Sequence, residues 1–141
     1  MKTKTLLLLC LFLGIGLTQI SAQSLQRGNL VGVHVVDLNL YPDATYKQWK
    51  EMMLNWIQKY EELLQGDGKV FLIEGTRGES KNEIGLIYVF KSESARDKYY
   101  KEDGTNSELG NQIQEKLQSV NKEFEKIEKS FTTKYTDWIV Q

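Results

Sequence analysis

NLVGVHVVDL, from Asn29 to Leu38, and NEIGLIYVFK, from Asn82 to Lys91, are the two stretches that decide the fold of this chain. Both are rich in β-branched and other apolar residues, and in each of them odd and even positions alike are mostly apolar. Successive side chains of a β-strand point to opposite faces of a sheet, so a strand of this kind is covered on both faces. We therefore expect both stretches to be central strands.

Two longer segments are amphipathic helices. Apolar residues recur every three or four positions from Tyr46 to Leu64 and from Leu109 to Ile127, which predicts a helix over each range. Asp43 is the expected cap of the first helix. Between the two helices, Ser94 with Asp97 three residues later resembles a capping box that opens a short third helix.

Two further strands complete the pattern. Lys69–Arg77 is expected to form a hairpin with Asn82–Lys91, and Phe131–Val140 alternates with one polar side, as an edge strand does. The order strand, helix, strand, strand, helix, strand specifies a split βαβ unit. We predict an α+β, ferredoxin-like two-layer sandwich with a four-stranded antiparallel sheet. Right-handed crossovers place its first and third strands in the middle.

One face of such a sheet has no helices over it. We expect Val31, Val33 and Val35 to point to that face, whereas Leu30, His34, Val36 and Leu38 point the other way along the strand. Left exposed, the valines and their neighbours form a patch on the order of several hundred Å², whose burial at ~25 cal/mol per Å² is worth many kcal/mol. The expected partner is a second copy of the chain, in a homodimer joined through the sheet face.

The first 22 residues resemble a secretory signal peptide. Lys2 and Lys4 precede an apolar run from Leu6 to Leu17, and Ala22 suits cleavage before Gln23. The run is about 12 residues, too short to cross a bilayer as a helix. We expect residues 23–141 to be one domain of a secreted or periplasmic protein, with no membrane attachment after cleavage.

Composition excludes several classes of function. The one cysteine, Cys10, lies in the expected leader, so the remaining chain has neither a disulfide nor thiol chemistry. The formal net charge is −1, and loss of the two leader lysines makes it more acidic, which argues against a nucleic-acid partner. No nucleotide-binding, serine-hydrolase or zinc-protease motif occurs. We expect no metal and no cofactor, because one histidine without a carboxylate cluster is a poor ligand set.

The strand order, the two-sided central strands and the sequence GVHVVDL before an aromatic-rich helix resemble the dimeric α+β barrel superfamily, over Asn29 to Gln141. That superfamily includes antibiotic-biosynthesis and haem-degrading monooxygenases, chlorite dismutases, and stress-responsive barrel proteins with related cyclases. The resemblance implies a pocket within each subunit, between helices and sheet. The haem-degrading motif does not transfer, because the chain has no histidine on a helix.

His34 is the first candidate catalytic residue. It is the only histidine and thus the one side chain poised by default to exchange a proton near neutral pH. The resemblance adds that a histidine on the first strand recurs in the stress-responsive and cyclase groups. The alternative is a core histidine whose nitrogens are satisfied by neighbouring groups.

Glu74 is the second candidate catalytic residue. It shares strand parity with Val70 and Leu72, so it would join His34 and Tyr88 in one pocket if that parity faces the helices. The alternative is a carboxylate that is solvated or paired with Arg77.

The candidate ligand-binding residues are Tyr88, Trp49, Met53 and Trp56. The three on the first helix would line an aromatic cavity or, alternatively, simply form core. The sequence therefore predicts a domain that binds a small apolar or aromatic molecule between sheet and helices. A cofactor-independent monooxygenase or cyclase that uses His34, and a structural or interaction domain with a filled core, remain alternatives.

Overall fold

The computed structural model describes residues 25–141, so the expected signal peptide lies outside the described residues. The elements follow in the order β1 (Leu30–Leu40), α2 (Tyr46–Leu63), β2 (Gly68–Glu74), β3 (Ile84–Phe90), α3 (Glu93–Asp97), α4 (Glu108–Phe124) and β4 (Glu128–Ile139). This order confirms the predicted succession of strands and helices, with the short α3 before α4.

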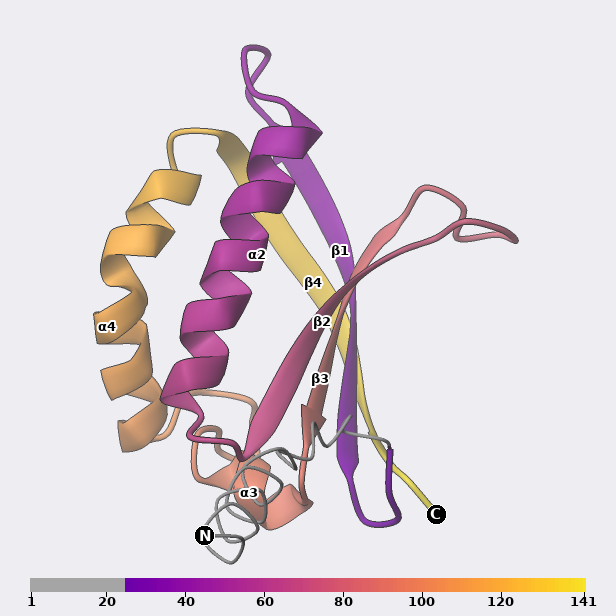
Figure 1. Ribbon diagram of the computed structural model, residues 1–141, viewed down its shortest axis with the longest axis vertical. Coiled ribbons are helices and arrows are strands. Elements are labelled where there is room, and N and C mark those ends of the chain that lie inside the picture. Colours follow the sequence, from indigo (N-terminus) through magenta and orange to yellow (C-terminus); the bar gives the residue numbers. More distant parts are fainter. Residues whose placement is uncertain (1–24) are drawn as a thin grey trace, which may run out of the picture.

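The four strands form one antiparallel sheet in the order β2-β3-β1-β4. The fold is thus the predicted α+β ferredoxin-like sandwich, with β1 and β3 in the middle and β2 and β4 at the edges. Helices α2 and α4 lie side by side against one face of the sheet, and no helix within residues 25–141 covers the other face (Figure 1). Within residues 25–141, no helix has both the length and the apolar character needed to span a bilayer.

The pleat of β1 separates its side chains as predicted. Leu30 and Val36 are buried in the core beneath the helices, and His34, on the same parity, is half-buried. Val35, on the opposite parity, is 48% exposed. Two neighbouring strands fix this register, because His34 pairs with Leu86 of β3 on one side and with Tyr135 of β4 on the other.

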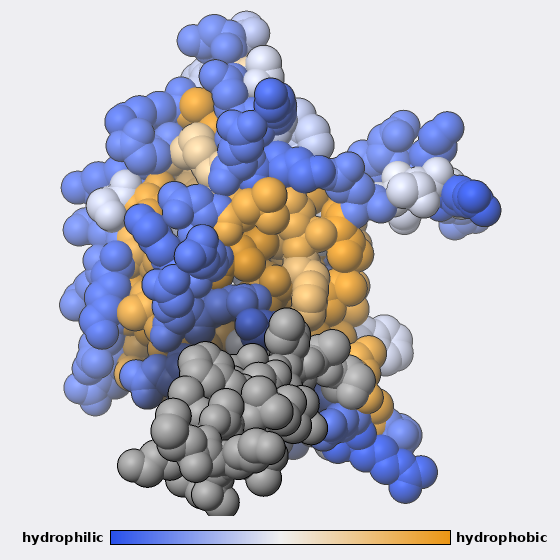
Figure 2. All heavy atoms as spheres, viewed as in Figure 1, coloured by the Kyte–Doolittle hydropathy of each residue, from blue (hydrophilic) through white to orange (hydrophobic). Residues whose placement is uncertain are grey.

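The core lies between the helices and the sheet. Trp49 and Tyr60 of α2 and Leu117 of α4 are almost completely buried. Hydrophilic residues cover the outer side of α4 and the turn between β2 and β3, whereas hydrophobic residues gather beside α2 and over β2 (Figure 2). The predicted amphipathic stripes are therefore the surfaces that close the core.

Two helix caps differ from the predicted ones. Thr45, not Asp43, caps α2. Its hydroxyl accepts a hydrogen bond from the backbone N–H of Gln48, and the side-chain oxygen of Gln48 accepts one from the backbone N–H of Thr45. Ser92, not Ser94, caps α3, since its hydroxyl accepts from the Ala95 amide. Each observed cap satisfies a backbone donor of the first turn.

The cap of α2 gives a direct test of this geometry. Replacement of Thr45 by alanine is expected to lower the free energy of unfolding by about 1 kcal/mol, because the first turn loses a hydrogen-bond acceptor. Replacement of Asp43 by alanine serves as the control and is expected to change it by less than about 0.5 kcal/mol, as for an ordinary surface substitution. Urea denaturation followed by circular dichroism measures both. Equal losses in the two variants would contradict the assignment of the cap.

Candidate functional site

Two cavities lie on opposite sides of Tyr88, which projects from β3 toward the helices. The first, here called the Trp56 cavity, has a volume of about 190 Å³. It is lined by residues of α2, α4, β3 and β4, namely Met53, Trp56, Leu86, Tyr88, Asn121, Phe124, Glu128 and Phe131. Because most of these side chains are apolar or aromatic, the Trp56 cavity suits an apolar molecule.

The polar groups of the Trp56 cavity are tied to the tryptophans of α2. The Trp56 indole N–H donates to Asn121 Oδ1 at 3.0 Å, and the Trp49 indole N–H donates to Glu128 Oε2 at 3.0 Å. Burial raises the pKa of Glu128, and the hydrogen bond from Trp49 opposes this effect. The cavity wall thus carries an acid whose protonated, neutral form is favoured by its surroundings.

The second cavity, here called the His34 cavity, has a volume of about 110 Å³. It lies between the sheet and the segment that follows α3, and it is lined by Gly32, His34, Tyr88, Phe90, Arg96, Tyr100, Gly104, Tyr135 and Asp137. The sheet register explains its floor, because Gly32 pairs with Tyr88 of β3 and with Asp137 of β4. The row across these three strands therefore has no side chain in its middle.

Gly32 keeps this floor open. A Cβ atom built at Gly32 would lie 2.9 Å from Asp137 Oδ1, 3.4 Å from His34 Nε2 and 3.7 Å from Tyr88 Cβ. Glycine within a strand is often found where a ligand or another chain segment approaches closely. Here it leaves a space toward which a carboxylate oxygen and an imidazole nitrogen converge.

The His34 ring is held between two tyrosines. Its centroid lies 4.7 Å from that of Tyr88 and 5.1 Å from that of Tyr135, which stacks on it. His34 Nδ1 lies 3.5 Å from the Thr133 hydroxyl, at the outer limit of a hydrogen bond. Burial lowers the pKa of His34, and the Asp137 charge opposes this shift. The imidazole is therefore favoured in its neutral form.

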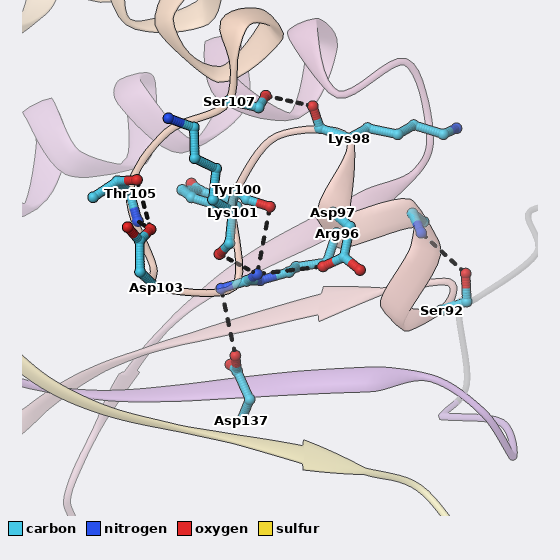
Figure 3. Close-up of polar contacts among 11 residues, drawn as sticks. Ser92, Arg96, Asp97, Lys98, Tyr100, Lys101, Asp103, Thr105, Ser107 and Asp137 are labelled. Atoms are coloured by element: carbon cyan, nitrogen blue, oxygen red, sulfur yellow. Dashed lines mark hydrogen bonds and ion pairs between the residues drawn. The ribbon is translucent and has the colours of Figure 1, made fainter.

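Arg96 reaches over the His34 cavity from α3 toward β4 (Figure 3). Its Nη1 donates to the Lys101 carbonyl at 2.8 Å, and its Nη2 lies 3.9 Å from Asp137 Oδ2. The guanidinium also lies 5.4 Å from the centroid of the Tyr100 ring. Arg96 thus ties the α3 segment to the edge strand and brings a positive charge to the cavity.

Further contacts hold the walls of the His34 cavity. The Tyr100 and Tyr60 hydroxyls are 2.6 Å apart, and this hydrogen bond joins the segment that follows α3 to α2. Gly104 adopts φ +81°, and a Cβ built there would lie 2.6 Å from the Tyr135 hydroxyl. A side chain at position 104 would therefore collide with Tyr135, so glycine permits this loop to close against β4.

The structure brings some of the predicted site residues together. Met53, Trp56 and Tyr88 line the Trp56 cavity, and Trp49 is buried behind its wall, bonded to Glu128. His34 and Tyr88 meet in the other cavity. Tyr88 is therefore the one predicted residue shared by both cavities.

Glu74 does not join this group. Its parity faces the helices, but it pairs with Ile84 at the far end of β3, where its carboxylate contacts Lys50 and the Tyr46 hydroxyl. The hydrogen bond from Lys50 is the main reason why the pKa of Glu74 is lowered. The expectation that Glu74 shares a pocket with His34 is thus wrong, because the two residues lie two strands apart in the sheet. Arg77 is not its ion-pair partner either.

Three residues of the His34 cavity were not among the sequence candidates: Gly32, Arg96 and Asp137. A glycine within an otherwise β-branched strand was a signal for Gly32. Asp137 shares the parity of Tyr135 on β4, which the alternation could have shown. Arg96 lies in a charged run without any local signal that it folds back onto β4. Within residues 25–141, three or more potential metal-binding side chains do not cluster anywhere.

Comparison with known proteins assigns no family to this chain. No protein-family model matches the chain, and no curated protein matches it in sequence. An uncharacterized NIPSNAP-like domain protein from Burkholderia xenovorans has 11% identity over 82% of this chain and 87% of its own, with a TM-score of 0.47. A dimeric protein of unknown function and ferredoxin-like fold from Bacteroides fragilis has 12% identity over 81% and 98%, with a TM-score of 0.36. Both proteins resemble this chain in structure, and neither similarity carries a family or an activity over to it.

Proposed function

We propose that this domain binds a small, largely apolar or aromatic molecule in the Trp56 cavity. The observation that carries the proposal is the space of about 190 Å³ left between α2, α4 and the sheet, where close packing is the rule. An engineered apolar cavity of about 150 Å³ is large enough to hold benzene. The Trp56 cavity is therefore large enough for a single aromatic ring with a short substituent.

The His34 cavity favours a second candidate function, in which His34 accepts a proton from a bound substrate. Its neutral imidazole has Nε2 directed toward the space above Gly32. A general base must be unprotonated and within reach of the proton that it removes. This arrangement supports a cofactor-independent monooxygenase or cyclase as the alternative.

We also propose that two copies of the chain pair through the uncovered sheet face. Exposed apolar side chains occupy three of its strands: Val35 on β1, Phe71 and Ile73 on β2, and Trp138 on β4, exposed by 41–60%. With strands about 4.8 Å apart, the flat area of this face is on the order of 500 Å², without the additional surface of the protruding side chains. A second copy would contribute the same apolar face, and the area approaches the roughly 800 Å² per partner of a standard interface.

The Trp56 cavity is tested with toluene as the probe. Replacement of Met53 by tryptophan is expected to weaken toluene binding by at least about tenfold, because the indole occupies the space that the ligand needs. Calorimetric titration measures the affinity. Replacement of Leu54 by tryptophan is the control, since Leu54 is the next residue on α2 and is 49% exposed.

In the unchanged protein, toluene is also expected to shift the NMR resonance of the Met53 methyl group and to leave that of Met52 in place. Binding without a Met53 shift, or equal binding by both tryptophan variants, would show that the Trp56 cavity is not the site.

The neutrality of His34 is tested by NMR titration of its ring protons, which are unambiguous because the chain has one histidine. The pKa of His34 is expected to lie below 6.5, and Asp137→Asn is expected to lower it further, because the carboxylate favours the imidazolium. The unfolded chain then binds more protons than the folded one between that pKa and 6.5. The free energy of unfolding should therefore fall as the pH drops through this interval, and less so in His34→Gln. A pKa above 6.5 would remove the basis for a neutral His34.

The homodimer is tested by sedimentation of the purified protein. The unchanged protein is expected to sediment as a dimer at high micromolar concentration, and Val35→Asp as a monomer, because a carboxylate in the apolar face lacks a partner. Leu54→Asp is the matched control: Leu54 is 49% exposed, against 48% for Val35, but it lies on the outer side of α2. A monomeric unchanged protein, or a monomeric control, would contradict pairing through the sheet.

A further inference from the structure

The His34 cavity contains polar groups that the proposed binding of an apolar molecule does not use. Asp137 Oδ1 and His34 Nε2 lie 2.9 Å and 3.4 Å from one point, the Cβ position that Gly32 leaves empty. This point is one bond length from the Gly32 Cα, so a ligand atom lies beyond it, in the cavity that both groups line, and can approach them there. The Asp137 carboxylate accepts a hydrogen bond there, and the neutral His34 ring accepts or donates at Nε2 according to its tautomer, so a ligand group that can both donate and accept suits the pair.

Arg96 adds a donor to the same space. Its Nη1 contacts Asp97 Oδ1 and the Tyr100 and Lys101 carbonyls, whereas its Nη2 faces Asp137 Oδ2 across 3.9 Å. That separation is too long for a hydrogen bond, but one oxygen atom between the two groups can lie within hydrogen-bond distance of each. A hydroxyl group fits both requirements, because it donates one hydrogen bond and accepts two.

The charges of the cavity select against ions. Arg96 and Asp137 are opposite charges on its wall, and the side chain of Arg96 is 12% exposed. A cation would meet the guanidinium and an anion would meet the carboxylate, and either would have to give up its hydration. A neutral ligand avoids both costs.

The walls select for a ring. The tyrosine rings at positions 88, 100 and 135 surround the space, and Tyr135 is held in place by its stacking on His34. The volume of about 110 Å³ is partly open at the sheet edge, where Tyr135 is exposed. Because this is less than the roughly 150 Å³ that holds benzene, the cavity takes in the hydroxyl-bearing edge of a six-membered ring, and the rest of the molecule extends through the opening to the solvent.

We propose that the His34 cavity is a second binding site, for an uncharged six-membered ring that carries a hydroxyl group. The hydroxyl lies above Gly32, where it donates to Asp137 or His34 and accepts from Arg96. The ring lies against the tyrosines. This site is separate from the Trp56 cavity, and Tyr88 forms the wall between them.

The test uses the full protein and follows the His34 ring protons by NMR during titration with four probes. Phenol and methyl glucoside represent the aromatic and the saturated hydroxyl-bearing ring, and benzoate and benzylammonium are their charged counterparts. At least one neutral probe is expected to shift the His34 resonances and to bind at least about tenfold more tightly than either ion. The neutral probe that binds shows whether the site takes an aromatic or a saturated ring. Binding by neither, or tighter binding of an ion, overturns the proposal.

A variant pair separates recognition from a merely structural role. Asp137→Asn removes the carboxylate that faces Arg96 Nη2 and leaves Asp97, 3.3 Å from Nη1, as the remaining ion-pair partner of Arg96, so the affinity for benzoate is expected to rise relative to that for phenol. Asp37→Asn, an exposed carboxylate on the opposite face of β1, is the control and should keep the original preference. An unchanged preference in Asp137→Asn would show that Asp137 does not select the ligand.

A second pair separates this proposal from that for the Trp56 cavity. Gly32→Ala is expected to abolish the response of His34 to the neutral probe and to leave toluene binding unchanged. Met53→Trp is expected to do the reverse. Loss of both ligands in Gly32→Ala with an unchanged thermal unfolding midpoint would refute two independent sites. If Gly32→Ala does not fold, the preference measured in Asp137→Asn decides the proposal.

Discussion

The pleat of β1 is the constraint on which the rest of the structure depends. Leu30 and Val36 must face the helices to complete the core, and His34 lies on the same parity. The strand is paired with β3 from Leu30 to Val36 and with β4 from Leu30 to Leu40. A slip by one residue would turn Leu30 and Val36 to the uncovered face and exchange them for odd-numbered residues, most of them valines, so the register depends on the fit of these side chains in the core and on the two paired strands. The position of His34 beneath the helical layer is thus a consequence of core formation.

Within that register, one missing side chain creates the polar cavity. Glycine in a strand costs about 0.5–1 kcal/mol relative to alanine, because its backbone loses more conformational freedom on folding. Gly32 is nevertheless in the middle of a three-strand row, between Tyr88 and Asp137. Backbone pairing on both sides of β1 offsets the cost and holds the flanking side chains in place. The cavity is therefore part of the most firmly paired region of the sheet.

The fold could be predicted from the sequence because buried faces of strands and helices require apolar residues at regular spacings. The two-sided apolar stretches were indeed the central strands, and the stripes of the two long helices do cover the core. Cap positions were less accessible, since Asp43 and Thr45 are both competent caps and the choice depends on the side chain of Gln48. The site was harder still. The alternation of side chains along the strands places His34 and Tyr88 on one face of the sheet. It does not give the distance along and across the strands that separates Glu74 from these two residues. Nor does it show that Arg96 reaches β4.

The surroundings of His34 favour recognition over turnover. A catalytic histidine is commonly oriented by a firm hydrogen bond from the nitrogen that does not face the substrate, as in a hydrolase triad. Here Nδ1 has only the Thr133 hydroxyl at 3.5 Å, and the acidic residue, Asp137, lies on the same side of the ring as the cavity. Asp137 therefore competes with His34 for a ligand's proton-bearing atom and does not support the imidazole from behind. A carboxylate and an imidazole nitrogen that face one space, opposite an arginine, form an arrangement that holds a hydroxyl group more readily than it ionises one.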